Sequence, residues 1–129
     1  MSNKSETYTD VTILFADIVG FTAYSGAKAA RQVVEMLSKL FTEFDKECNR
    51  LNLFKLYTIG DCYVVMGFMD KRNRKSPAEE AHDVVQLGFS MIRNIAKVRK
   101  MVKYDDLSMR IGIHTVGYTH SRAVWYTEA

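Results

Sequence analysis

The stretch TILFADIVGFTAYSG, residues 12–26, places one carboxylate, Asp17, at the end of an apolar run and follows it with Gly20. Residues 11–16, VTILFA, are β-branched and aromatic, which is typical of a buried strand. The glycines at 20 and 26 predict a turn or a short helix after that strand. Asp17 is then either the N-cap of this helix or a functional side chain at the end of the strand.

The bulk composition limits the classes of protein that fit. The chain has 129 residues, 47% hydrophobic and 26% charged, as expected for one ordinary globular domain. A net charge of +3 is too small to indicate nucleic-acid binding. The basic run KRNRK at 71–75 is expected to be a solvated loop. We therefore expect no nucleic acid among the partners.

Cysteine usage and hydropathy favour a cytoplasmic protein. Cys48 and Cys62 form neither a metal-binding spacing nor a disulfide framework, which indicates a reducing compartment. No apolar run approaches the roughly 20 residues needed to cross a bilayer, and the N-terminus lacks the apolar centre of a signal peptide. We expect no membrane contact by this chain itself. Any membrane anchor of a parent protein would lie outside it, with this domain on the cytosolic side.

Two long helices are predicted from apolar periodicity. Apolar residues recur three and four positions apart over about 28–50 and again over 76–102. The second segment opens with Ser76 as N-cap, Pro77 in the first turn and Glu79 three residues after the cap, a capping-box signature.

Three further strands are predicted beside the one at 11–16. LFKLYTI at 53–59 and CYVVMGF at 62–68 flank the turn residues Gly60 and Asp61, which is typical of a hairpin. LSMRIGIHT at 107–115 alternates apolar and polar residues like a strand. The order β, α, β, β, α, β is the ferredoxin-like arrangement of the α+β class, an antiparallel sheet with helices on one face.

This topology brings two distant carboxylates together. We expect the first strand and the hairpin strands to be neighbours at the centre of the sheet, so that Asp17 lies beside Asp61 at the hairpin turn. Carboxylates are hard ligands suited to Mg²⁺ or Mn²⁺, and two such ions can activate a hydroxyl and stabilise a leaving phosphate. Backbone N–H groups from Ile18 to Thr22 could hold phosphate oxygens. On the alternative interpretation Asp17 is a helix cap and Asp61 an ordinary turn residue.

Three segments resemble the class III nucleotide cyclases, the family of adenylate and guanylate cyclases. VTILFADIVGFTAYS is similar to the family's first metal motif, KLYTIGDCYVVMGF to its second, and LSMRIGIHT to the strand that leads into a glycine-rich segment. They occur in the family's order over residues 10–115. The second motif is most similar in wording to protist guanylate cyclases.

The resemblance implies a reaction and a set of site residues. It makes the carboxylates of Asp17 and Asp61, with the carbonyl of Ile18, the ligands of two Mg²⁺ or Mn²⁺ ions. It implies conversion of GTP, or less favourably ATP, into a 3′,5′-cyclic nucleotide and pyrophosphate. Tyr57 falls at the base-selecting position, where the family typically has Glu for guanine or Lys for adenine, so it matches neither. The triphosphate would be bound at Ile18, Gly20, Phe21 and Thr22.

The resemblance covers residues 10–115 only. We therefore expect an N-terminal extension at 1–9, a partial cyclase domain at 10–115 and an atypical tail at 116–129. After RIGIHT, where the family has a Gly and later a catalytic Asn and Arg, this chain has Val116, Gly117 and an unpatterned tail without counterparts of those two catalytic residues. Since the family's active sites lie between two cyclase domains, we expect this chain to need a second, complementary cyclase domain and to be inactive alone. The alternative is a truncated, non-catalytic module that pairs with or regulates a full-length cyclase.

Overall fold

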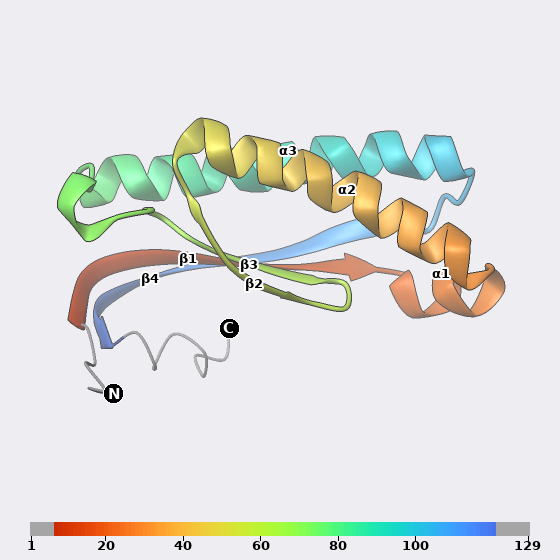
Figure 1. Ribbon diagram of the computed structural model, residues 1–129, viewed down its shortest axis with the longest axis horizontal. Coiled ribbons are helices and arrows are strands. Elements are labelled where there is room, and N and C mark those ends of the chain that lie inside the picture. The colour runs from red at the N-terminus through yellow and green to blue at the C-terminus, as the bar shows by residue number, and fades with distance from the viewer. Residues whose placement is uncertain (1–6, 121–129) are drawn as a thin grey trace.

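The computed structural model describes residues 7–120 as two layers, a sheet and a layer of helices (Figure 1). The expected α+β class and the βαββαβ order are confirmed, with one short helix added after the first strand. The elements are β1 (Thr7–Val19), α1 (Phe21–Ala27), α2 (Ala30–Leu51), β2 (Phe54–Ile59), β3 (Cys62–Met66), the 3₁₀ turn η1 (Lys71–Asn73), α3 (Pro77–Val102) and β4 (Ser108–His120).

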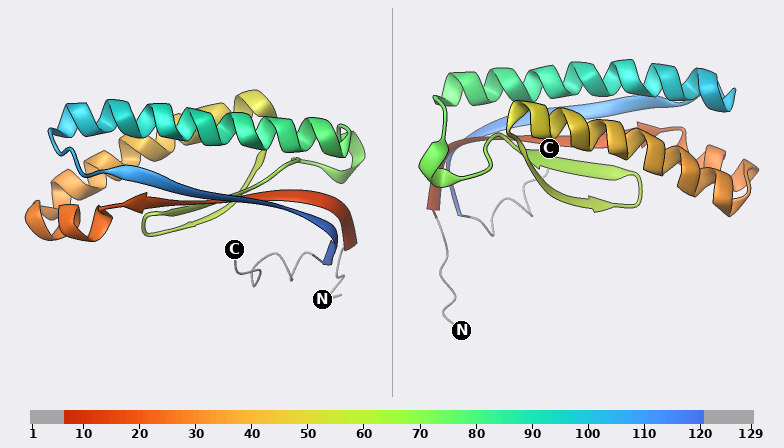
Figure 2. Two further views of the ribbon diagram at one scale, coloured as in Figure 1. Left: turned by 180° about the vertical axis from the view of Figure 1, so that it is seen from behind. Right: turned by 45° about the horizontal axis from the view of Figure 1, so that its top comes forward.

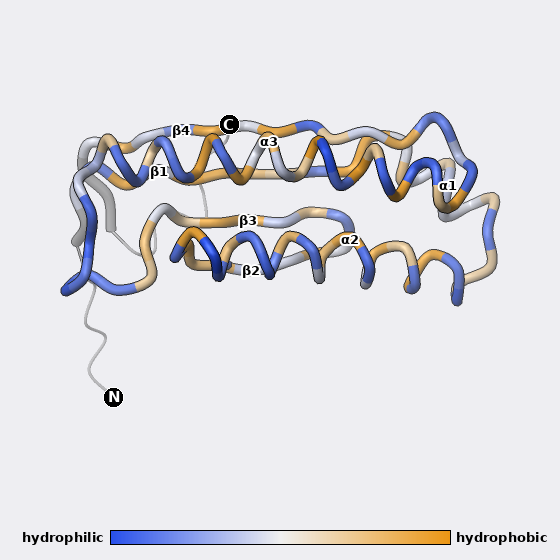
Figure 3. Tube along the Cα trace, turned by 90° about the horizontal axis from the view of Figure 1, so that it is seen from above, coloured by the Kyte–Doolittle hydropathy of each residue, from blue (hydrophilic) through white to orange (hydrophobic). Residues whose placement is uncertain are grey.

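The four strands form one antiparallel sheet in the order β2-β3-β1-β4. Strands β3 and β1 are the central strands. We expected both hairpin strands, β2 and β3, at the centre of the sheet, but β2 lies at an edge. The helices α2 and α3 cover the same face of this sheet (Figure 2). Seen from above, α3 lies over β1 and β4 and α2 over β2 and β3 (Figure 3). None of the helices within residues 7–120 is long and apolar enough to cross a bilayer.

Alternation along β1 separates two apolar clusters, because successive side chains of a strand point to opposite faces. Leu14, Ala16 and Ile18 belong to the main core beneath the helices. Val11 and Ile13 belong to a second, smaller cluster on the opposite face. The helices fill the main core with side chains from one stripe each, chiefly Met36, Leu40, Phe44 and Cys48 of α2 and Val84, Leu87, Met91, Ile95 and Val98 of α3.

Strands β1 and β4 are longer than their sequence patterns indicate. They pair from Thr7↔His120 to Val19↔Ser108, whereas the sequence predicted strands only over 11–16 and 107–115. Each strand is longer than predicted because its partner supplies hydrogen bonds to the additional residues. Residues 116–120 therefore continue β4, residues 121–129 lie outside the described part, and the division of the chain at residues 10 and 115 stays a prediction.

Helix α1 begins at a glycine that no other residue could replace without strain. Gly20 is the N-cap, with φ 84°, in the left-handed region that glycine tolerates best. A Cβ at this position would also lie 2.6 Å from the backbone oxygen of Asp106. No side chain caps α1, so the interpretation of Asp17 as its N-cap is wrong. The charge at the end of β1 needs a different explanation.

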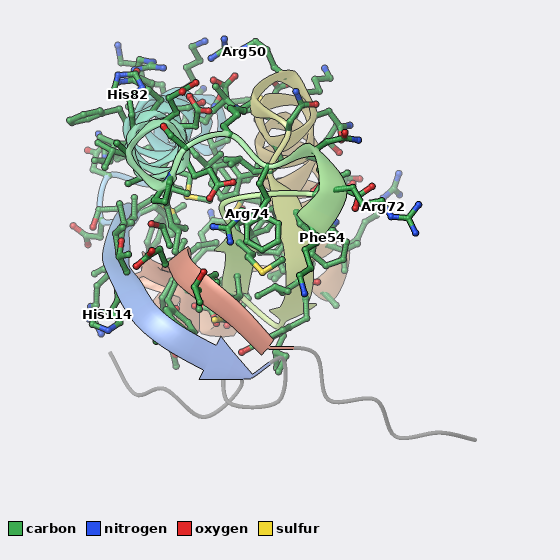
Figure 4. All side chains as sticks on the ribbon, turned by 90° about the vertical axis from the view of Figure 1, so that its left-hand side faces the viewer. Arg50, Phe54, Arg72, Arg74, His82 and His114 are labelled. Atoms are coloured by element: carbon green, nitrogen blue, oxygen red, sulfur yellow. The ribbon has the colours of Figure 1, made fainter. Side chains whose placement is uncertain are left out.

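The basic run at 71–75 is only partly a solvated loop. Arg72 projects away from the molecule, whereas Arg74 points inward (Figure 4). The Arg74 guanidinium pairs with Glu80 at 2.6 Å, donates to the carbonyl oxygens of Thr9 and Asp10, and stacks 4.0 Å from the centre of a phenyl ring, that of Phe68.

The neighbouring helix start follows its sequence signature. The Ser76 hydroxyl accepts a hydrogen bond from the backbone N–H of Glu79 at 3.2 Å, which confirms Ser76 as the N-cap of α3. The Glu79 carboxylate accepts from the same hydroxyl at 3.0 Å.

Candidate functional site

The register of the sheet brings the two aspartates together. Asp17, near the end of β1, pairs with Cys62, the first residue of β3. Asp61 precedes Cys62 in the turn between β2 and β3, and Gly60 supplies the positive φ of 56° that this turn needs. The hairpin turn and the end of β1 thus meet at one edge of the molecule. The expected juxtaposition of Asp17 and Asp61 is what the structure contains.

The aspartates lie on the face of the sheet that the helices leave open. Asp17 follows Ile13 and Phe15 at the odd positions of β1, opposite to the positions that pack beneath the helices. Paired residues of neighbouring strands share a face, which defines two rows across this surface. The aspartate row is Ile59, Cys62, Asp17 and Arg110, and the tyrosine row beside it is Tyr57, Val64, Phe15 and Gly112.

The Asp17 carboxyl lies close enough to Asp61 to affect the pKa of Asp61. Burial, followed by a hydrogen bond with the Asp17 carboxyl and by its negative charge, raises the pKa of Asp61. The backbone N–H groups of Asp61 and Ile18 oppose this shift because they stabilise the carboxylate. Burial and the two nearby carboxylates also raise the pKa of the Cys62 thiol, which is therefore a poor nucleophile. Negative charge is therefore crowded at this site.

The raised pKa of Asp61 makes the protein less stable as the pH rises. The folded chain holds the Asp61 proton more tightly than the unfolded chain does. The contribution to stability is therefore fully present below the ordinary aspartate pKa of 3.8 and is lost as pH rises through the higher pKa of the folded state. We expect Asp61→Asn to remove this loss. Urea unfolding in the absence of divalent cations at pH 4 and pH 7 checks it: the stability of wild type relative to Asp61→Asn should fall with pH. Parallel pH profiles would contradict the proximity of the two carboxylates.

The donor set fits a hard divalent cation. Two adjacent carboxylates repel one another, and a cation between them would remove that repulsion and accept both as oxygen ligands. Within residues 7–120, no three His, Cys, Asp or Glu side chains gather around one point. The two aspartates would thus leave coordination positions for water, backbone carbonyl or substrate oxygens, as Mg²⁺ and Mn²⁺ prefer.

The residues expected to bind a triphosphate follow directly after Asp17. The Ile18 side chain is buried in the main core, so only its backbone is available at the site. Phe21 packs against the same core, while Thr22 is exposed in the first turn of α1. Close packing of Gly20 against the segment before β4 fixes the start of this turn. This segment therefore offers a ligand its backbone N–H groups and the exposed Thr22 side chain.

Arg110 is a site residue that the sequence did not reveal. Strand β4 pairs Arg110 with Asp17, and the guanidinium Nη1 lies 4.0 Å from Asp17 Oδ2. The Arg110 side chain is 74% exposed and that of Asp17 is 44% exposed, so the pair contributes little to stability. Only the register of β4 against β1 reveals that this cation shares a row with the aspartates.

Comparison with known proteins gives one family. Residues 3–125 match the adenylate and guanylate cyclase catalytic domain. The chain is 38% identical over 110 residues to guanylate cyclase alpha of Plasmodium falciparum and 41% identical over 110 residues to the guanylate cyclase of Toxoplasma gondii. These alignments cover 84% and 83% of this chain, but only 3% and 2% of the two relatives.

Solved structures agree on the fold. The adenylyl cyclase CyaB from P. aeruginosa superposes with a TM-score of 0.79 at 23% identity, covering 91% of this chain and 60% of that one. The monomeric guanylyl cyclase domain of the RhoGC fusion protein from Blastocladiella emersonii superposes with a TM-score of 0.76 at 25% identity, covering 92% and 66%. This chain therefore spans about two thirds or less of these solved chains.

Proposed function

Because this chain belongs to the adenylate and guanylate cyclase catalytic domain family, we propose that it supplies the metal-binding part of a cyclase that converts GTP into 3′,5′-cyclic GMP and pyrophosphate. In this reaction the 3′-hydroxyl of the nucleotide attacks its own α-phosphate. The observation that carries the proposal is the pairing of Asp17 beside the turn that holds Asp61, on the open face of the sheet. This juxtaposition follows from the strand pairing of the fold and does not depend on the sequence similarity of either motif to the family.

Each site residue has a role that follows from its position. Asp17 and Asp61 would hold two Mg²⁺ or Mn²⁺ ions with the Ile18 carbonyl as a further ligand, and the bound ions would supply charge stabilisation at the phosphates and acidify the attacking hydroxyl. The backbone from Gly20 to Thr22 would orient the phosphate chain. Arg110, exposed beside Asp17, would neutralise part of its charge and offer guanidinium N–H groups to phosphate oxygens.

Guanine is the base that we propose, with adenine as the second candidate. The curated relatives from Plasmodium and Toxoplasma are named guanylate cyclases, and their similarity to this chain exceeds one third identity. Tyr57 lies in the tyrosine row, on the same face as the aspartates, where an aromatic ring can contact a purine. A phenol carries no charge to distinguish guanine from adenine, so discrimination would depend mainly on the complementary domain.

A complementary cyclase domain is the partner that we propose. The chain spans 60% to 66% of the solved cyclase chains cited above, and the family resemblance implies active sites that lie between two cyclase domains. One related structure is described as a non-canonical dimeric guanylyl cyclase domain. The outer face of α3 and the adjoining β4 edge also expose a group of apolar side chains, which favours a covered surface in the assembly. They are Val85, Phe89, Ile92 and Ile113.

A test of this function uses the 129-residue chain with and without a complementary domain. We expect no cyclic nucleotide from GTP or ATP with Mn²⁺ when the chain is alone. Activity should appear when it is mixed with the Blastocladiella guanylyl cyclase domain in which the residues aligned with Asp17 and Asp61 are replaced by alanine, so that only this chain can supply the carboxylates.

Product analysis by liquid chromatography separates the possible outcomes. Cyclic nucleotide formed by the chain alone would contradict the need for a partner. A complex that forms without producing cyclic nucleotide would contradict catalysis and support the second candidate, a non-catalytic module that pairs with a cyclase. Both candidates would use the exposed apolar face of α3 as the surface that pairs with a cyclase.

A further inference from the structure

The turn that follows Asp17 has little local structure to hold it in place. Gly20 begins α1, a helix of only seven residues that no side chain caps and that has no acidic residue in its first turn. So short a helix is not stable by itself in water, because it forms few hydrogen bonds for the number of residues that it fixes. The conformation of residues 20–22 must therefore depend on contacts with other parts of the chain.

The segment 103–107, between α3 and β4, supplies these contacts. Figures 1 and 2 show this segment and α1 at the same end of the molecule. The backbone of Asp106 packs so closely against Gly20 that a Cβ there would lie 2.6 Å from the Asp106 oxygen. The Tyr104 ring meets the buried Tyr24 ring edge to face, with 5.2 Å between the ring centres and 79° between the planes. The first turn of α1 is thus held at both of its ends.

Arg99, near the end of α3, fixes the segment 103–107 in turn. Its carbonyl oxygen accepts a hydrogen bond from the Tyr104 N–H at 3.1 Å, just after Lys103 has ended the helix with a φ of 55°. Its guanidinium Nη1 donates to the Leu107 carbonyl oxygen at 2.6 Å. The Leu107 side chain is fully buried in the main core. One arginine therefore binds the backbone on both sides of the residues that contact α1.

The proposed metal ligands are held in a different way. Asp17 is fixed by its pairing with Cys62 of β3 on one side and with Arg110 of β4 on the other. Asp61 is fixed by the hairpin turn that precedes Cys62. Neither carboxylate needs α1, so a change in the contacts of α1 can affect bound phosphates without affecting bound cations.

We propose that Arg99 and Tyr104 are positioning residues that hold residues 20–22 so that their backbone N–H groups face the triphosphate. This inference rests on the proposed cyclase function, and it concerns only the phosphates of the nucleotide and not its base. Hydrogen bonds weaken steeply as their angle departs from linear, so a small rotation of the turn would weaken phosphate binding. The contacts use the Asp106 backbone and not the exposed carboxylates of Asp105 and Asp106.

The test compares phosphate binding with cation binding. Inorganic tripolyphosphate is titrated into the 129-residue chain with Mn²⁺ present, and Mn²⁺ is titrated by itself. We expect Tyr104→Ala and Arg99→Met each to weaken tripolyphosphate binding about tenfold, the scale of one hydrogen bond to a charged group, and to leave Mn²⁺ binding unchanged. Tyr104→Phe, which keeps the ring, and Arg99→Lys, which keeps a donor, should retain most of the affinity. The matched control is Arg93→Met, which removes an exposed guanidinium from the same helix and should bind both probes like wild type.

Two results would overturn the proposal. One is an unchanged tripolyphosphate affinity in either folded variant. The other is an equal loss of Mn²⁺ and tripolyphosphate affinity, because a general loosening of the fold would weaken both. Arg99→Met keeps the aliphatic part of the side chain, so it decides the question if Tyr104→Ala fails to fold.

A ligand-free measurement separates this proposal from the proposed function. The Tyr24 N–H donates to the Gly20 carbonyl oxygen at 3.0 Å and closes the first turn of α1. In Arg99→Met this amide should exchange with solvent faster than in wild type, while the amide of Leu40 in α2 should keep its rate. An unchanged Tyr24 rate would contradict the positioning role, whatever the chain binds. If the Tyr24 rate rises but wild type binds no tripolyphosphate with Mn²⁺, the proposed function of the site fails, and this inference fails with it.

Discussion

Asp17→Asn and Asp61→Asn should each reduce the rate of cyclic nucleotide formation at least about 100-fold in the assembly with a complementary cyclase domain. The size follows from the loss of a carboxylate that holds the cations, since electrostatic stabilisation of developing phosphate charge contributes several kcal/mol. Asparagine keeps the shape of the side chain, and removal of one charge from the pair also relieves repulsion with the other. Loss of activity should therefore come without loss of stability.

The measurement is the initial rate with Mn²⁺–GTP, together with the thermal midpoint of each variant. Asp105→Asn is the matched control, because Asp105 is exposed in the turn before β4 and lies apart from the aspartate row. It should keep the wild-type rate. An Asp17→Asn or Asp61→Asn variant with a wild-type rate would remove that carboxylate from the proposed chemistry.

Arg74→Ala should destabilise the fold by about 3–5 kcal/mol, because it leaves the buried Glu80 charge without its partner. The Glu80 side chain is 1% exposed and that of Arg74 is 18% exposed. The change also removes the donors to the carbonyls of Thr9 and Asp10. Together these contacts hold the beginning of β1 against the beginning of α3.

Urea unfolding of two further variants makes this prediction specific. Arg72→Ala removes the same side chain from an exposed position two residues earlier and should leave the unfolding free energy within about 0.5 kcal/mol of wild type. Arg74→Met combined with Glu80→Met should recover most of the loss, since an apolar pair carries no unpaired charge. An unfolding free energy of Arg74→Ala equal to that of wild type would contradict the buried pair.

Much of the fold could be predicted from local patterns. The helix start at Ser76 depends on residues within one turn, and the hairpin around Gly60 depends on a short turn sequence, so both were visible in the sequence. The proximity of Asp17 and Asp61 could be predicted because the βαββαβ order determines which strands are neighbours. The roles of these aspartates in binding metal stay predictions.

The parts that could not be predicted depend on register and on contacts distant in sequence. Nothing in the residues around Arg110 indicates that β4 pairs it with Asp17. Arg74 looks like one charge of a basic run, and only the fold brings it to Glu80 and Phe68. The register shift between Lys55 and Tyr57 of β2 is equally hidden. The order of apolar and polar residues in LFKLYTI does not reveal that one residue of the strand is extra.

The central claim is that Asp17 and Asp61 together bind divalent cations. Paramagnetic broadening of the amide signals of the chain by Mn²⁺ tests this claim most directly, because the broadening detects weak binding residue by residue. At low Mn²⁺ the amide signals of Ile18, Asp61 and Cys62 should broaden first in wild type and should remain sharp in the double variant Asp17→Asn/Asp61→Asn. Equal broadening of these signals in the double variant, or first broadening elsewhere in wild type, would contradict the claim.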